Sequence, residues 1–246
     1  MPMVKRIWLL PVLLIPVLIA ATFPAAVVVP RLDLPPNLAR IAGTVWSGSA
    51  HWQQAGWQPL DVRWRWQGGR EWHWEASGGQ TLLQGRWLLA SSRSSSLPAV
   101  SGQLELDRLD LAHWLAIARP VGVLEMNLSD VVLTGSGGLQ AQGQIVWRAA
   151  ELRGAIQETL GDIEILIDDE EGNAEEINLT VRSLSPASIQ VRGSIVLNAV
   201  RYDADLWLRA APGRTDLTSS LAAIGELQPD GQVRLQLGGS TGLQDG

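Results

Sequence analysis

The sequence predicts a mainly β protein, in which an N-terminal transmembrane helix precedes a curved antiparallel sheet with one or two short helices. The sheet is expected to be open or partly closed, like a groove or barrel. Three observations predict this class: an apolar N-terminal segment, many short runs of alternating apolar and polar residues, and 25 glycines among 246 residues. Alternation with a period of two is typical of antiparallel strands with one buried and one solvated face.

The composition excludes several functions. The chain has no cysteine, so disulfides, thiolate zinc sites and thiol catalysis are all excluded. Without Lys5 and Arg6 in the N-terminal tail, 17 basic residues remain against 25 acidic ones, which gives a net charge of −8. This charge argues against nucleic acid as a partner. Twelve of the aromatic residues are tryptophan, against one tyrosine and one phenylalanine.

Residues 7–29 are predicted to anchor the protein in a membrane. They carry no charge, and 23 helical residues would extend about 35 Å, enough for a hydrocarbon core of about 30 Å. Lys5 and Arg6 precede this segment, so the positive-inside rule leaves residues 1–6 in the cytoplasm and places residues 30–246 across the membrane as one domain. A cleaved signal peptide is the alternative, but the segment has no good A-x-A cleavage motif.

The exported part contains a repeated frame, Gly-x-apolar-x-apolar. We expect each frame to start a strand after a turn glycine. The six frames begin at Gly102, Gly122, Gly143, Gly161, Gly193 and Gly231.

Two segments look helical. Asp110 is expected to cap a short helix that ends before Pro120, and Asp216 to cap a second helix over residues 217–224.

A tryptophan-rich hairpin is the densest feature of the sequence. A three-residue loop, 68–70, would pair Trp66 with Trp72 and Trp64 with Trp74, and would gather the intervening charged residues on the opposite face. A two-residue loop would break this pattern, so the odd loop is favoured. The tryptophan face is either the core face of the sheet, which we favour, or a surface for acyl chains, the membrane interface or a partner.

No catalytic, cofactor or metal site is predicted. His51, His73 and His113 lie in separate segments, and none has a second ligand at a metal-binding spacing. The acidic run at residues 168–173 lacks the alternating ligands of a calcium loop and is interpreted as a hairpin turn. No nucleophile motif occurs, so we expect a protein that is not an enzyme.

The segment from Leu38 to Ala50 reads L-A-R-I-A-G-T-V-W-S-G-S-A. It closely resembles the Gly-Thr-hydrophobic-Trp-Ser-Gly signature of type II secretion system protein N. The similarity continues through Trp64 and Trp66 after Leu60, and through further segments at Gly102, Gly143, Leu221 and Gln228, so it spans nearly the whole chain. The Trp72 and Trp74 doublet and the acidic run depart from the family pattern.

This resemblance implies a single-pass protein of the bacterial inner membrane with a periplasmic domain. It would be a non-enzymatic accessory subunit that assembles or scaffolds protein export from the periplasm, with other inner-membrane secretion subunits as partners and no cofactor. The family also resembles the AsmA-like proteins, whose curved sheets form lipid grooves. The alternative function is therefore a periplasmic protein that binds or shuttles phospholipid in an apolar groove.

The signature segment 43–48 is expected to be the first strand after the anchor, because Thr44 and Trp46 alternate with Val45 and Ser47. Its glycines either fit the fold or admit a docking partner. The candidate contacts with a partner or lipid are Gly43, Thr44, Trp46, Gly48, Trp64, Trp66, Trp72 and Trp74.

Overall fold

The computed structural model describes most of the predicted exported domain. The described residues are 22–28, 37–53, 58–88, 94–108, 118–134, 139–154, 157–168, 176–198 and 200–240. The predicted cytoplasmic tail, and the predicted anchor up to residue 21, lie outside them. Among the residues described, no helix combines the length and the apolar composition needed to cross a bilayer.

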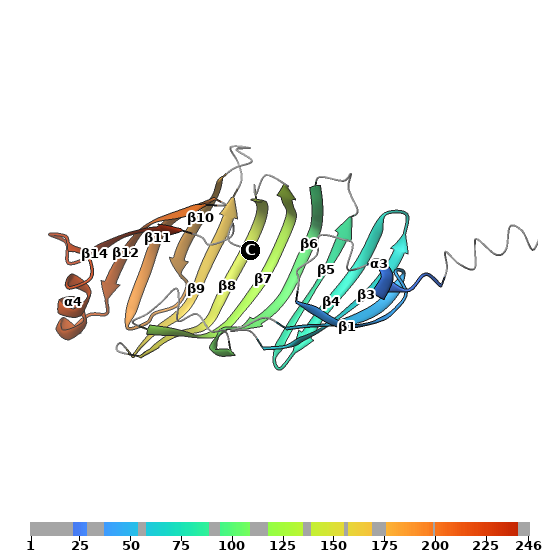
Figure 1. Ribbon diagram of the computed structural model, residues 1–246. Coiled ribbons are helices and arrows are strands. Elements are labelled where there is room, and N and C mark those ends of the chain that lie inside the picture. Colours follow the sequence, from blue (N-terminus) through green and yellow to red (C-terminus); the bar gives the residue numbers. More distant parts are fainter. Residues whose placement is uncertain are drawn as a thin grey trace, which may run out of the picture.

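Fourteen antiparallel strands form one sheet, and almost all of them lie beside their neighbours in chain order. The strands are β1 (Leu38–Gly43), β2 (Ser47–Trp52), β3 (Leu60–Gly68), β4 (Glu71–Gly78), β5 (Thr81–Leu88), β6 (Ser94–Glu105), β7 (Ala118–Thr134), β8 (Leu139–Gly154), β9 (Glu158–Asp168), β10 (Glu176–Ser183), β11 (Ile189–Asn198), β12 (Arg201–Ala210), β13 (Glu226–Leu227) and β14 (Val233–Ser240). The chain order is broken at one end, where β14 pairs with β12 and the short β13 lies outside β14. The sheet is long, twisted and strongly curved (Figure 1), so the predicted open, curved antiparallel sheet is confirmed.

Two short α-helices lie at opposite ends of the row of strands, α3 (Ala25–Val28) beside β1 and α4 (Thr215–Ala222) beside β12 and β14 (Figure 1). A 3₁₀ turn (Leu106–Arg108) follows β6. The predicted C-terminal helix is present, but it starts at Thr215, so Asp216 lies in its first turn instead of capping it. There its negative charge favours the positive end of the helix dipole, and Arg214 donates hydrogen bonds to it.

The other predicted helix, after Asp110, falls on residues 109–117, which lie outside the described part of the chain. Among the described residues, Ala118 and Pro120 already belong to β7. Proline lacks an N–H donor, and it is tolerated in this strand close to a β-bulge between Val121 and Val123. Residues 169–173 of the acidic run are also outside the described part, but the flanking strands β9 and β10 pair as antiparallel neighbours.

Register places the apolar side chains on one face of the sheet, which we call the inner face. The predicted alternation is confirmed in β9 and β10, where Ile165 pairs with Val181 and Ile167 pairs with Leu179. The outer face carries polar partners such as Glu164 and Arg182. Apolar residues continue along the inner face of the paired strands from β3 to β14, with Trp64, Trp74, Leu83, Val100, Met126, Ile145, Ile165, Leu179, Ile195, Leu206 and Leu235 as members.

Two clusters of buried residues lie on this inner face. One cluster joins Ile163 and Val181 to Val233 and to the two buried leucines of α4, Leu217 and Leu221. The other joins Val100, Val131, Ala141 and Ile177, from strands β6, β7, β8 and β10. Since these strands are not all neighbours in the sheet, contact between them requires the sheet to bend around its inner face.

Most glycines of the repeated frame lie inside strands, so the prediction that each one starts a strand is wrong. Only Gly231 lies in a turn before its strand. Gly193 has φ +152°, and a Cβ there would lie 2.1 Å from the carbonyl oxygen of Asp205 in β12. Gly102 has φ +146° and the same separation from the carbonyl oxygen of Leu82 in β5. These glycines let neighbouring backbones approach closely where the sheet bends.

The substitution Gly193→Ala tests this role. We expect it to lower the free energy of unfolding by about 3 kcal/mol, because the added methyl group overlaps backbone atoms that cannot move alone. Gly231→Ala is the matched control, since Gly231 also has a positive φ, +78°, but nothing lies within 4 Å of its Cβ position. The control should lose only about 1–2 kcal/mol. Urea unfolding followed by tryptophan fluorescence measures both, and equal losses would contradict the close-approach argument.

Candidate functional site

The ends of the signature segment 43–48 belong to β1 and β2, and its residues 44–46 form the turn between them, so the prediction of one continuous strand is wrong. Gly43 pairs with Gly48 across the turn. The Thr44 amide donates to the Ser47 carbonyl at 2.9 Å, and the Ser47 amide donates to Thr44 Oγ1 at 3.2 Å. Gly43 has φ +87°, and a Cβ at this position would lie 2.6 Å from the Ser47 carbonyl oxygen. A tight turn of this kind requires glycine at position 43.

The predicted register of the tryptophan hairpin is confirmed. Strands β3 and β4 pair Trp64 with Trp74 and Trp66 with Trp72. A bulge at Gly68, which pairs with Glu71, supplies the extra residue that the odd loop requires. The charged residues are paired on the outer face, as expected, with Arg63 opposite Glu75 and Arg65 opposite His73.

Two indole groups connect this hairpin to the signature turn. Trp64 Nε1 donates to the Thr44 carbonyl at 3.1 Å, and Trp72 Nε1 donates to the Val45 carbonyl at 3.1 Å. Each hydrogen bond joins a turn carbonyl to a partly buried indole N–H, so neither group bears the free-energy penalty of an unsatisfied buried polar group.

Further tryptophans pack around the same turn. The rings of Trp46 and Trp66 have centroids 5.0 Å apart, and those of Trp72 and Trp87 are 5.9 Å apart. We call Trp46, Trp64, Trp66, Trp72, Trp74 and Trp87 the tryptophan cluster. The structure therefore brings all eight candidate contact residues together at the β1 end of the sheet.

The last described part of the predicted anchor, residues 22–28, also meets this turn. The Val45 amide donates to the Phe23 carbonyl at 3.1 Å, and Pro24 forms an isolated β-bridge with Thr44. Ala25, the first residue of α3, is completely buried. The turn thus holds the entering chain against the first two hairpins.

The members of the tryptophan cluster differ in exposure. Trp66 is 40% exposed, whereas Trp74 packs against the buried cluster around Val100. The Trp74 indole nitrogen is buried, and no hydrogen-bond partner for it is found in the described structure. Trp66 is therefore the exposed member of the cluster, whereas the other five are half-buried.

Aromatic rings on the inner face cover glycines of the neighbouring strands, a feature that the sequence analysis missed. A Cβ at Gly48 would lie 2.4 Å from the ring of Trp64, and one at Gly85 would lie 2.8 Å from the ring of Trp74. The same arrangement recurs where Trp147 covers Gly122. Both residue types are visible in the sequence, but their juxtaposition depends on strand register.

The outer face carries paired charges. Arg182 donates a hydrogen bond to the nearly buried Glu164, which holds the pKa of that carboxyl below its usual range. Arg234 binds Asp205 with two hydrogen bonds, of 2.8 and 2.6 Å, and these lower the pKa of the Asp205 carboxyl. Within the described ranges, no group of three or more histidine, aspartate or glutamate side chains is arranged to hold a metal ion.

The difference in exposure between Trp74 and Trp66 predicts different losses of stability when each is replaced by alanine. Trp74→Ala should lower the free energy of unfolding by about 3–5 kcal/mol, because it empties a packed site. Trp66→Ala should cost less than about 2 kcal/mol, because much of its ring already contacts water. Urea unfolding of both variants measures the difference. A loss for Trp66→Ala as large as that for Trp74→Ala would contradict the proposed division of the cluster.

Comparison with known families shows the family of this chain. The family model described as type II secretion system (T2SS), protein N, matches residues 36–236, a range that includes the signature turn, the tryptophan hairpin and most of the sheet. Searches of curated proteins and of solved structures found no match. The matched range covers far more than half of the sequence, and the chain therefore belongs to the type II secretion system protein N family.

Proposed function

We propose that this protein is a non-enzymatic accessory subunit of the type II secretion machinery, which helps to assemble or scaffold protein export from the periplasm. Membership of a family of secretion-system components, over residues 36–236, is the observation that carries the proposal. In this proposal the segment 7–29 anchors the chain in the inner membrane through a single span, with the N-terminus in the cytoplasm and the sheet in the periplasm, and its residues 22–28 meet the sheet on the periplasmic side.

The shape of the sheet supports a scaffolding role. Neighbouring strands lie about 4.8 Å apart, so a row of fourteen strands extends roughly 60 Å. Residues 22–28 contact the turn at the β1 end, which is the end nearest the proposed anchor. The strands at the other end therefore lie far from the anchor, where they can meet partners deeper in the periplasm.

Affinity purification tests the scaffold proposal. The full chain, tagged and extracted from inner membranes in mild detergent, should co-purify other inner-membrane secretion subunits. An unrelated single-pass protein with the same tag is the control. Removing the chain should lower both the abundance of those subunits and the secretion of their substrates. Normal secretion and normal subunit levels without the chain would overturn the proposal.

A second function, phospholipid binding, is favoured by one observation on the inner face. Its apolar residues continue across neighbouring strands along most of the sheet, yet most of them remain only half-buried. Acyl chains gain about 0.8 kcal/mol for each methylene removed from water, so a continuous apolar face of this length suits them. Lipid binding and a scaffolding role are compatible, because the first uses the inner face alone.

Native mass spectrometry of the full chain after a detergent wash tests lipid binding. We expect retained phospholipid in the unaltered protein and its loss in Ile165→Glu, which places a charge on the inner face. Leu166→Glu is the matched control, because Leu166 is the next residue of β9, is also half-buried and faces outward. Circular dichroism verifies that both variants fold. A lipid-free unaltered protein, or equal retention by the two variants, would exclude the lipid role.

A further inference from the structure

Among the residues that the structure describes, the outer edge of β14 is unpaired along most of its length. β13 pairs only with Val233 and Arg234, and in the part of the chain that the structure describes no strand pairs with the outer edge of residues 235–240. The opposite edge of the sheet is different. There β1 carries a bulge at Arg40, which has φ +51°, and α3 packs beside it. Bulges and covering helices protect sheet edges from further pairing, and the edge of β14 has neither along residues 235–240.

The backbone groups that this edge presents follow from the turn between β13 and β14. The Gln228 amide donates to the Gln232 carbonyl at 2.8 Å, so residue 232 directs its backbone polar groups toward the outer edge. Backbone direction alternates along an antiparallel strand. Gln236 and Gly238 therefore also present their N–H and C=O groups outward, in position to pair with an added strand.

The inner side of this edge is apolar and accessible. Leu237 is 45% exposed, Leu227 is 52% exposed and Ile224 is 43% exposed. Leu237 and Leu227 come from β14 and β13, and Ile224 follows α4. Apolar side chains on the inner side of an added strand would cover this patch.

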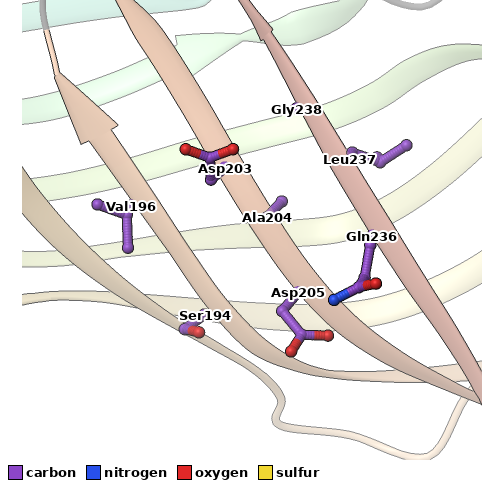
Figure 2. Close-up of a pocket in the computed structure, with 8 residues that line it drawn as sticks. All are labelled: Ser194, Val196, Asp203, Ala204, Asp205, Gln236, Leu237 and Gly238. Atoms are coloured by element: carbon purple, nitrogen blue, oxygen red, sulfur yellow. The ribbon is translucent and has the colours of Figure 1, made fainter.

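The outer side of the same edge carries two aspartates, each with an arginine nearby. A pocket of about 370 Å³ opens there across β11, β12 and β14, and its lining includes Asp203, Asp205 and Gly238. In Figure 2, Asp203 and Asp205 project from β12 next to β14, while Leu237 points away from them. Asp205 is already bound by Arg234 through two hydrogen bonds. Asp203 is 61% exposed, and its contact with Arg201 is 3.4 Å long.

Because Gly238 has no side chain, a residue on a strand added outside β14 can reach the Asp203 carboxylate. A Cβ at position 238 would lie 3.1 Å from Asp203 Oδ1, so the carboxylate lies over this glycine. No side chain at position 238 separates the carboxylate from a strand added outside β14. A lysine or arginine placed opposite Gly238 on such a strand could therefore pair with Asp203.

We propose that the edge of β14 docks an extended segment of a partner protein by strand addition. The segment carries apolar side chains at alternate positions toward the inner face, and between them a lysine or arginine directed at Asp203. Backbone hydrogen bonds at Gln236 and Gly238 supply the pairing, and the side chains set its register. This inference goes beyond the accessory role, and it holds whether or not lipid occupies the inner face.

Labelled peptides test the proposal with the full chain in nanodiscs. The probe Thr-Val-Lys-Val-Thr has the required pattern, and Thr-Val-Glu-Val-Thr differs only in charge. We expect the lysine peptide to bind about tenfold more tightly by fluorescence anisotropy, and Asp203→Asn to remove most of that preference. Asp61→Asn is the matched control, because Asp61 lies on the same outer face in β3 and is similarly exposed, at 69%. It should leave the preference unchanged.

Hydrogen exchange at the edge provides the second measurement. The lysine peptide should slow amide exchange at Gln236 and Gly238 and leave exchange at β1 unaffected. The proposal is overturned if neither peptide slows exchange at these two amides, if both peptides bind equally well, or if Asp61→Asn acts like Asp203→Asn. Full protection of both amides without peptide would also overturn it, because a second copy or the chain's own remaining residues would already fill the edge.

Discussion

The constraint that governs this structure is that a single sheet must shield its apolar face with its own curvature. In the described residues the only α-helices beside the sheet are α3 and α4, at its two ends. The inner face is therefore buried mainly by side chains from strands that are not all neighbours, as in the cluster that includes Val100 of β6 and Ile177 of β10. Burial of this kind is incomplete, which explains why so many inner-face residues remain half-buried.

Curvature in turn explains the pairing of glycines with large residues. A strand can bend toward its neighbour only where no Cβ intervenes, and Gly193 and Gly102 provide such positions. The missing side chain leaves apolar surface uncovered, and an aromatic ring from the adjacent strand covers it, as Trp74 covers Gly85. The high tryptophan content thus has a structural cause at this end of the sheet, independent of any ligand.

The sequence predicts the strand-level features well, because alternation and cross-strand pairing are local. The Trp-x-Trp spacing on both sides of Gly68 and Gly69 determines the hairpin register, since only an odd loop places the four rings together. Glycine is ambiguous, because the same residue suits a turn, as at Gly231, and a close approach within a strand, as at Gly193. The signature turn is hard to recognise from the sequence, because the alternation of Thr44 and Trp46 with Val45 and Ser47 also suits a strand, whereas in the structure hydrogen bonds between Thr44 and Ser47 close a turn.

Two surfaces of the sheet are available for binding, the inner face and the β14 edge, and they present different chemical groups. Side chains project perpendicular to the sheet, so the apolar residues of many strands determine which ligands bind the inner face. Backbone groups lie in the plane of the sheet, so backbone hydrogen bonds and a few flanking side chains determine which partner binds the β14 edge. At the β1 edge the turn carbonyls of Thr44 and Val45 are used by Trp64 and Trp72, and the Val45 amide binds Phe23. A sheet fastened in this way at one end, with no described strand paired to residues 235–240 at the other, can receive a partner at that edge without disturbing a ligand on its inner face.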